Sequence, residues 1–418
     1  MDVAFEKAAA HGAPAKAAAL VKDGKTLWTG GKGATADTPF RIASLTKAFT
    51  ATVVLQLVNE GKTGLDDPIG KALPDLPEAW RGATVRQLLN HTSGIPSYTE
   101  LSSFPARISE RSTPMGIVGR SSDKPLDFAS GTRFKYDNTG YTILGVLVEK
   151  LDHRPFGESL QARILKPLGM VRTHLDTGGK AEALGFGGDG KPAAAIDMSQ
   201  PYAAGSIVST ASDMAKWVAA QGSERLLPGS LWAEAGKPGV LTDGKSMGYG
   251  FAWIVGTLNG VPTLEHGGGI PGFSSYVRRV PSRGLGVVVL ANQEGDEPQR
   301  IARAILLAAD ASLEAPKVVV DDPDSKVTRE TERLLHGFEA GKPDKSVVGE
   351  RLATALTPAA IDGGKAFLRS LGAFREPRLT KVDGLSRTYL AIYDKGDVQV
   401  LIVRDEAGLF VGFSMKPA

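Results

Sequence analysis

The stretch Ser44-Leu45-Thr46-Lys47 decides how this chain is interpreted, because it places a hydroxyl and an amine three residues apart. An apolar run follows and Gly61 supplies a stop, so a long buried helix is predicted to begin here. Residues at i and i+3 share one helix face, which lets the Lys47 amine approach the Ser44 hydroxyl. A desolvated lysine can take the proton of a serine, so the pair predicts nucleophilic catalysis.

A second segment, Tyr136-Asp137-Asn138, stands before a predicted helix over 138–152. A serine that merely caps a helix, with a solvated lysine, fits the first motif equally well, so this second segment matters. A tyrosine near a lysine can share its proton, and a carboxamide can hold both the lysine and a substrate carbonyl. The alternative is a loop tyrosine and an asparagine that caps the helix.

The third segment is His266-Gly267-Gly268-Gly269, at the end of a predicted strand. Glycines weaken a strand unless something approaches its backbone closely. A substrate lying antiparallel along this strand would need the space at Gly268. An N–H near Gly269 and the N–H of Ser44 then form an oxyanion hole. The alternative is a loop with a surface histidine.

Taken together, the three motifs S-x-x-K, Y-x-N and H-G-G resemble the penicillin-recognising serine hydrolases. This group contains class C β-lactamases, D-Ala-D-Ala carboxypeptidases, D-aminopeptidases and family VIII esterases. The resemblance covers about residues 10–310, and it extends to the flanking segments 40–43, 89–96 and 204–210.

The resemblance implies that Ser44 is the nucleophile that becomes acylated, and that Lys47 and Tyr136 transfer its proton, with either as base at a given step. Asn138 then orients the substrate, and no metal or other cofactor takes part. His266 stands where β-lactamases place a lysine. A histidine is largely neutral at pH 7 and grips a carboxylate less well than a lysine. The expected function is therefore an esterase or a D-amino-acid-directed peptidase or amidase, with β-lactamase as the alternative.

The implied fold is α/β (α+β) and β-lactamase-like, with an antiparallel sheet flanked by helices and an all-helical lobe. A hairpin over 17–32 is predicted to share that sheet with later strands, at 250–255, 263–266, 273–280 and 286–290. Helices are predicted over 84–90, 138–152, 156–166 and 299–310.

Three parts are expected along the chain: a hydrolase domain over 1–313, a Pro- and Asp-rich linker over 314–324, and a small α+β domain over 325–418. Strands of this last domain are predicted at 387–393, 398–403 and 409–414. It carries no catalytic motif.

Composition narrows the class of protein. The chain has 418 residues, 42% of them apolar and 23% charged, with a net charge of +3 and no cysteine. Disulfides, thiolate metal sites and a cysteine nucleophile are therefore excluded. The balance of charge does not favour nucleic acid, and no apolar run is long enough to span a membrane. The expected partner is a small ester, amide or peptide; oligomeric state is left open.

The N-terminus, Met1 to Phe5, has no basic and no apolar leader region. Two compartments fit this. Either the protein is cytoplasmic, or Met1 replaces a removed signal peptide and the protein is periplasmic or secreted.

Two short patterns compete with this interpretation. Residues 244–248 match G-x-S-x-G, but a strand-like run follows them instead of the helix which that motif needs. Residues 239–246 match the phosphate-binding pattern G-x-x-x-x-G-K-[ST], which makes a nucleotide-binding protein the alternative from another class. A non-catalytic binding module is a third. His91 is expected to be structural, joining a helix end to a turn.

Overall fold

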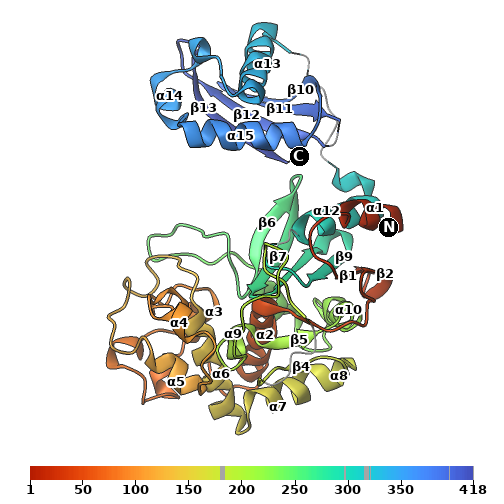
Figure 1. Ribbon diagram of the computed structural model, residues 1–418. Coiled ribbons are helices and arrows are strands. Elements are labelled where there is room, and N and C mark those ends of the chain that lie inside the picture. Colours follow the sequence, from red (N-terminus) through yellow and green to blue (C-terminus); the bar gives the residue numbers. More distant parts are fainter. Residues whose placement is uncertain (179–183, 296–297, 315–319, 321, 395, 418) are drawn as a thin grey trace. The chain divides into compact units, whose positions relative to one another are not determined.

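The computed structural model describes residues 1–418 except 179–183, 296–297, 315–319, 321, 395 and 418 (Figure 1). The chain divides into two compact units, Met1–Leu313 and Glu314–Ala418. None of the described helices has the length and apolar character needed to cross a membrane.

A six-stranded antiparallel sheet is the centre of the first unit, in the order β2-β1-β9-β8-β7-β6. Its strands are β1 (Lys16–Lys22), β2 (Lys25–Lys32), β6 (Ile254–Leu258), β7 (Val261–Ile270), β8 (Phe273–Val280) and β9 (Leu285–Ala291). The N-terminal hairpin thus pairs with the last strand of the unit, β9, through β1. The prediction that the hairpin shares one sheet with the late strands is confirmed.

Helices cover both faces of this sheet, so its central strands are apolar on both sides. On one face, α1 (Asp2–Ala8) and α12 (Pro298–Ala309) pack on Ala18 and Leu20 of β1. On the other face, α10 (Ala211–Ala220) belongs to the cluster that contains Ala17 and Ala19. Successive residues of a strand point to opposite faces, which explains why β1 alternates between the two cores.

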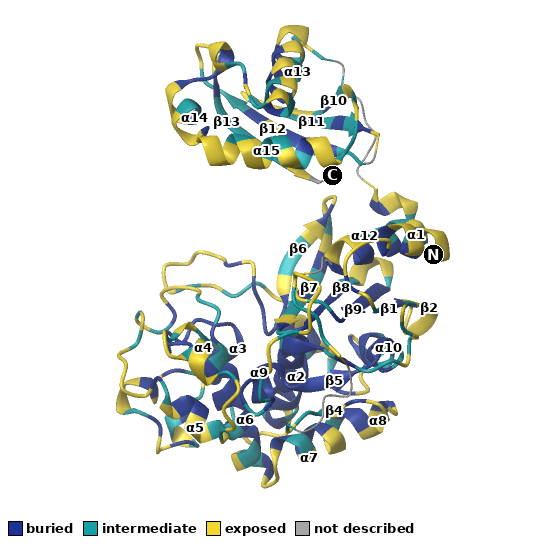
Figure 2. Cartoon of the chain, viewed as in Figure 1, coloured by how far each residue is buried: buried dark blue, intermediate teal, exposed yellow. Residues whose placement is uncertain are grey.

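The helical lobe lies between β2 and β6 in the sequence. It contains α2 (Thr46–Asn59), α3 (Val85–Leu89), α4 (Phe104–Arg107), α5 (Pro114–Gly119), α6 (Asn138–Asp152), α7 (Phe156–Leu160), α8 (Lys166–Leu168), α9 (Tyr202–Gly205) and α11 (Gly229–Ala235). The segment Gln161–Leu165, between α7 and α8, is a π-helix. Nearly every residue of α2 is buried (Figure 2), as expected of a helix that is apolar on all sides.

Two features of the first unit differ from the sequence prediction. The predicted strand over 250–255 is wrong in its bounds: β6 begins at Ile254, because residues 250–253 form a tight turn in which Gly250 N–H donates to Trp253 O. A small sheet β3-β5-β4 was not expected. It consists of β3 (Phe40–Arg41), β5 (Ile207–Ser209) and β4 (His174–Leu175).

In the second unit, helices precede a four-stranded antiparallel sheet in the order β10-β11-β12-β13. The elements are α13 (Ser325–Ala340), α14 (Glu350–Ala355), α15 (Pro358–Ser370), β10 (Phe374–Asp383), β11 (Ser386–Tyr393), β12 (Val398–Arg404) and β13 (Phe410–Pro417). The three predicted strands correspond to β11, β12 and β13. Strand β10 was not predicted from the sequence, because it is an edge strand whose alternation is interrupted by Pro377 and by charged side chains.

Candidate active site

Ser44 lies on a turn that the small sheet and α2 hold in place. Ala43–Leu45 forms a single 3-10 turn directly before α2, and Ile42 N–H donates to Ile207 O of β5 (3.0 Å). Ala43 has a φ of +47°, a left-handed conformation that residues with a side chain adopt only under constraint. Ser44 is partly exposed and lines a cleft, while its two neighbours on the turn, Ala43 and Leu45, are buried.

One turn later, the Lys47 side chain is fully buried and makes three hydrogen bonds. Its Nζ lies 2.8 Å from Asn138 Oδ1, 2.9 Å from Ala204 O and 3.2 Å from Ser44 Oγ. The Asn138 and Ala204 oxygens can only accept, so they take the two N–H groups of a neutral amine. The lone pair of that amine then faces the Ser44 hydroxyl, which is the arrangement that a general base needs.

Burial lowers the pKa of Lys47 to about 7, and the nearby Asp137 carboxylate opposes part of this decrease. Taking an ammonium out of water disfavours the charged form, which explains the direction of the shift. Near neutral pH, Lys47 can therefore be the uncharged amine that accepts a proton.

Asn138 begins α6, and its amide is held by two residues that the sequence analysis missed. Its Nδ2 donates to Thr99 Oγ1 (3.0 Å), and its backbone N–H donates to Ser97 Oγ (3.1 Å). Thr99 and Ser97 also bond to each other (2.9 Å). These contacts turn the Asn138 oxygen toward Lys47. The sequence Ser97-x-Thr99 gave no signal of this role, because the role depends on Asn138, which lies about 40 residues further along the chain.

Tyr136 completes the group around Ser44. Its ring centre lies 4.8 Å from Lys47 Nζ. Burial raises the pKa of Tyr136, and a hydrogen bond with Ser44 offsets this increase in part. The phenol is therefore protonated at neutral pH, and of the two groups the Lys47 amine is the better proton acceptor in the free protein.

Strand β7 packs directly against the Ser44 turn, and Gly268 makes this possible. A Cβ atom on Gly268 would lie 2.5 Å from Ile42 O and 3.1 Å from Ser44 N. The close neighbour of this glycine is therefore the protein's own Ser44 turn, whereas the sequence led us to expect a substrate there. Gly269 has open space around the same position, with no atom within 4 Å.

The second half of β7 presents backbone groups along its open edge. A two-residue turn joins Ile270 to Phe273, so these two residues form a hydrogen-bonded pair. Such pairs alternate along an antiparallel ladder, so the backbone N–H and C=O groups of Gly268 and His266 face β8, while those of Gly267 and Gly269 point away from it. On that side β6 pairs with β7 only from Val261 to Glu265. The N–H of Gly269 thus points away from β8, on the edge of β7 that β6 leaves unpaired.

His266 is buried beside this edge and carries no charge at neutral pH. Burial, and then the charge of Lys47, lower the pKa of His266 to about 4. Its Nδ1 lies 2.6 Å from Gly267 O, and its Nε2 lies 2.9 Å from the hydroxyl of Tyr249.

The cleft has a volume of about 770 Å³ and is mostly apolar and aromatic. It is lined by Ser44, Phe134, Tyr136, Met247, Gly248, Tyr249, Ile254, Glu265, His266, Gly267, Tyr276, Arg278 and Gln299. The charged residues in this lining are Glu265 and Arg278, and they form an ion pair with each other. The lining therefore has no net formal charge.

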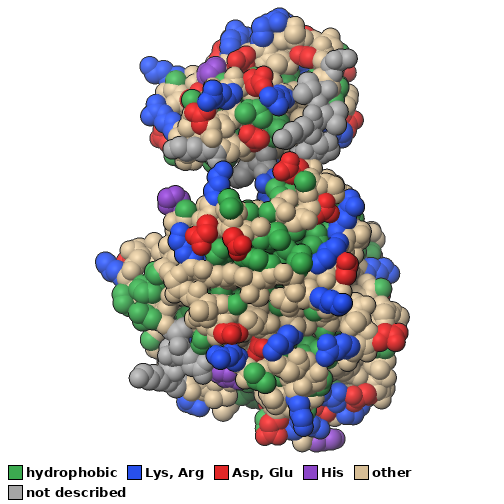
Figure 3. All heavy atoms as spheres, turned by 90° about the vertical axis from the view of Figure 1, so that its right-hand side faces the viewer, with side chains coloured by type: hydrophobic (Ala, Val, Ile, Leu, Met, Phe, Trp, Pro, Cys, Tyr) green, Lys and Arg blue, Asp and Glu red, His purple; other side chains and the backbone are tan. Residues whose placement is uncertain are grey.

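The competing patterns lie outside this cluster of Ser44, Lys47, Tyr136 and Asn138. Residues 241–246 form a surface turn, in which Ser246 is exposed and Lys245 pairs with Asp243 (2.7 Å). The next element is strand β6, so the helix N-terminus that a phosphate loop or a nucleophile elbow needs is absent from this part of the described chain. On the face in Figure 3, acidic and basic side chains are interspersed.

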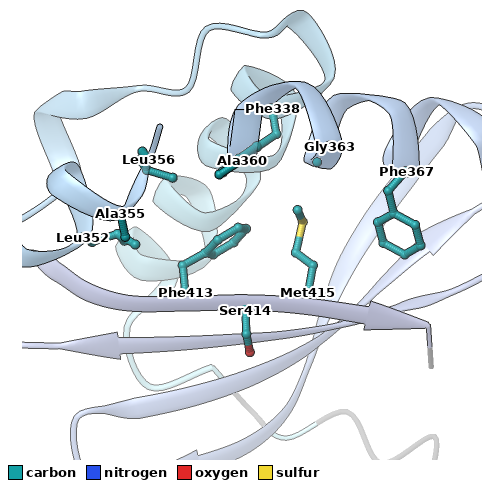
Figure 4. Close-up of a pocket in the computed structure, with 11 residues that line it drawn as sticks. Phe338, Leu352, Ala355, Leu356, Ala360, Gly363, Phe367, Phe413, Ser414 and Met415 are labelled. Carbon is teal, nitrogen blue, oxygen red and sulfur yellow. The ribbon is translucent and has the colours of Figure 1, made fainter. Parts of the chain in front are cut away.

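A pocket of about 370 Å³ in the C-terminal unit is apolar (Figure 4). Side chains from α14, α15 and β13 surround it, together with Phe338 of α13 and Leu356, which follows α14. Ser414 is the one polar side chain in its lining as described, so the pocket contains no acid or base for catalysis.

The lowered pKa of Lys47 predicts the pH dependence of turnover. If the neutral amine is the base, kcat/KM falls about tenfold per pH unit below pH 7 and levels off above it. Burial raises the pKa of Asp137 to about 7 as well, so this carboxyl carries only part of its charge in the same range. Asp137→Asn removes that charge, which raises the pKa of Lys47, so the acid limb moves modestly to lower pH. Asparagine caps a helix as well as aspartate does, which preserves the bond from Gly140 N–H. A pH profile whose acid limb stays in place, or moves to higher pH, contradicts this.

The contact at Gly268 gives a second prediction. Gly268→Ala forces β7 away from Ser44, so we expect kcat/KM to fall by about 10² or more and stability by about 1–3 kcal/mol. Gly267→Ala is the control for stability, because its nearest atom would lie 3.8 Å away, an ordinary contact. Kinetics of Gly268→Ala and thermal unfolding of both variants measure this, and equal losses of stability would contradict it.

Comparison with known proteins supports the family resemblance that the sequence motifs indicated. Residues 2–311 match the family model described as Beta-lactamase. Protein flp of Staphylococcus aureus (strain N315) is 28% identical over 304 residues, which are 67% of this chain and 59% of that protein. The match thus spans about three fifths of the length of this curated relative.

Solved structures of related proteins have the same fold. A D-stereospecific amidohydrolase from Streptomyces sp. superposes with a TM-score of 0.63 and 31% identity, over 74% of this chain and 97% of that one. The octameric penicillin-binding protein homologue from Pyrococcus abyssi superposes with a TM-score of 0.65 over 99% of this chain and 98% of that one. Its identity is 22%, so this likeness concerns the fold alone.

Proposed function

This chain belongs to the Beta-lactamase family, and from that premise we propose that it is a serine hydrolase that works through an acyl-enzyme on Ser44. The observation that carries the proposal is the contact between Lys47 and Ser44. A fully buried amine with a pKa of about 7 lies 3.2 Å from the hydroxyl, and its other two partners are acceptors.

In the proposed reaction, the substrate carbonyl lies between Ser44 Oγ and the N–H groups of Ser44 and Gly269. The Ser44 oxygen attacks the carbonyl carbon while Lys47 Nζ accepts the hydroxyl proton. The two N–H groups stabilise the negative charge that develops on the carbonyl oxygen. Collapse of the tetrahedral intermediate breaks the bond to the leaving group, which takes a proton from Lys47 or through Tyr136. Water then attacks the ester on Ser44 and releases the acid.

We propose that the substrate is a neutral ester, or an amide or peptide of a D-amino acid. Two observations support this choice. The Streptomyces relative is a D-stereospecific amidohydrolase. The cleft holds a neutral histidine where β-lactamases place a lysine, so a substrate carboxylate gains little there. A β-lactamase is the second candidate, because the same nucleophile and base would open a lactam ring.

A substrate panel tests the proposal directly. Purified protein is assayed with p-nitrophenyl acetate, D- and L-amino-acid amides, D-alanyl peptides and nitrocefin. We expect turnover of the acetate, with preference for D- over L-amides and slow or no opening of nitrocefin. Efficient nitrocefin hydrolysis would favour the second candidate. If the protein hydrolyses none of these substrates, the proposal is contradicted.

A further inference from the structure

Three buried side chains form a continuous hydrogen-bonded chain that ends beside the nucleophile. Asp137 N–H lies 3.1 Å from His91 Nδ1, and His91 Nε2 lies 3.2 Å from Tyr249 Oη. The Tyr249 hydroxyl then lies 2.9 Å from His266 Nε2, and His266 Nδ1 lies 2.6 Å from Gly267 O. His91, Tyr249 and His266 are each at most 4% exposed. We call this the His91–Tyr249–His266 chain.

Backbone groups at the two ends fix where every proton of this chain lies. Gly267 O can only accept, so His266 Nδ1 carries a proton, and in the neutral ring Nε2 is then the acceptor. The Tyr249 hydroxyl donates to that nitrogen, and its oxygen accepts from His91 Nε2. His91 Nδ1 remains free to accept from Asp137 N–H, which can only donate. All hydrogen bonds are satisfied when both histidines are neutral.

Protonating His266 would break this order. A proton on Nε2 would point at the Tyr249 oxygen, which already accepts from His91. The Tyr249 hydroxyl proton would then lose its acceptor, and His91 could not reverse its ring protons because Asp137 N–H occupies Nδ1. A buried donor without a partner is costly. The charge of Lys47 also opposes a charge on His266, the Tyr136 ring centre lies 6.1 Å from it, and the adjacent Glu265 is already paired with Arg278.

We propose that His91 and Tyr249 are positioning residues that keep His266 neutral, and that the cleft consequently selects acyl donors whose leaving group carries no negative charge. This inference rests on the proposed hydrolase function and narrows its substrates. A substrate lying antiparallel to β7 places its leaving group toward His266, where Tyr249 bonds to the histidine and Phe134 packs on Tyr249. Both ring nitrogens of His266 are used within the protein, so His266 offers the leaving group neither a cation nor a free donor, and Arg278 in the described lining is paired with Glu265.

Histidine NMR tests the chain without requiring any activity. In protein with ¹⁵N-labelled histidine, we expect His266 to show a proton on Nδ1 and His91 a proton on Nε2, with both patterns unchanged from pH 8 to pH 5.5. The His266 signals are identified by their loss in His266→Gln. A His266 ring that gains a second proton within this range would overturn the proposal.

Matched substrates test the selectivity. N-acetyl-D-alanine esters of glycolate and of glycolamide share the scissile bond and differ in the charge of the leaving group. We expect kcat/KM to favour the glycolamide ester by about tenfold or more, mainly through KM. Equal or better turnover of the glycolate ester would overturn the inference while leaving the hydrolase proposal intact. If neither ester is hydrolysed while p-nitrophenyl acetate is, the inference about the leaving group is overturned and the hydrolase proposal stands; if p-nitrophenyl acetate and the rest of the panel are also inert, the hydrolase proposal itself fails.

Tyr249→Phe removes the hydroxyl that links the two histidines. His266 Nε2 can then take a proton, so we expect the ring to titrate at higher pH and the preference for glycolamide to shrink at least threefold at pH 5.5. Tyr141→Phe is the matched control, because its ring also packs on His91 (5.0 Å) but its hydroxyl bonds to Leu89 O. The control keeps the wild-type NMR pattern and ester preference. If Tyr249→Phe does the same, the chain does not control His266.

Discussion

Ser44→Ala is expected to lower kcat/KM by about 10⁴-fold or more, which corresponds to about 5.5 kcal/mol in the barrier. The variant retains the cleft and the N–H groups but has no oxygen to form an acyl-enzyme. Its fold should survive, because the Ser44 hydroxyl bonds to Lys47 and Tyr136 at the edge of a cleft and the residue is partly exposed. We expect the free energy of unfolding to change by no more than about 1 kcal/mol.

Ser246→Ala is the matched control for this experiment. It makes the same chemical change at the G-x-S-x-G turn, where the serine is exposed. Turnover with any substrate that the panel identifies should remain within about twofold of wild type. A loss of more than about tenfold in this control, or substantial activity in Ser44→Ala, would move the nucleophile away from Ser44.

Lys47→Met is expected to lower kcat/KM by about 10³-fold, within the range that general-base catalysis contributes. Methionine fills a similar space but has no nitrogen to accept the Ser44 proton. The acid limb near pH 7 should vanish from the remaining activity, because the amine whose protonation stops the proton transfer is gone. A pH–rate profile of the variant measures both effects.

The chain offers a second buried lysine as a control. Lys16 in β1 is 1% exposed, and its Nζ donates to His11 O and Ala13 O, backbone oxygens that precede the strand. Lys16→Met therefore has the structural cost of losing a buried amine without the catalytic one. We expect its kcat/KM to stay within about threefold of wild type. A loss as large as that of Lys47→Met would show that the loss in Lys47→Met reflects disrupted packing.

Local patterns in the sequence were sufficient to predict much of the fold. The helix over 138–152 and the strand over 273–280 have the predicted bounds, because apolar periodicity and turn residues mark both ends. Residues 250–253 misled the analysis. Their composition is typical of a strand, but Phe251 N–H donates to Ala235 O and draws the chain into a turn. A contact with a residue 16 positions earlier leaves no local trace.

In the site, too, residues that belong to a local motif could be predicted from the sequence, and residues that act through distant partners could not. The spacing of Ser44 and Lys47 within one helical turn predicts their contact, and Asn138 follows from its motif. The role of Tyr249 did not follow, because it links His91 and His266 across three separate segments. His91 was expected to be structural, and its bond to Asp137 N–H agrees with that, but its second nitrogen also leads to the active site.

The central claim is that Ser44 Oγ is the atom that becomes acylated, and covalent labelling tests it most directly. The protein is treated with a fluorophosphonate at pH 8, and intact mass and peptide mapping locate the adduct. We predict one adduct, on the peptide containing Ser44, that is absent in Ser44→Ala and forms far more slowly in Lys47→Met. An adduct on Ser246 or elsewhere, or undiminished labelling of Ser44→Ala, would contradict the account.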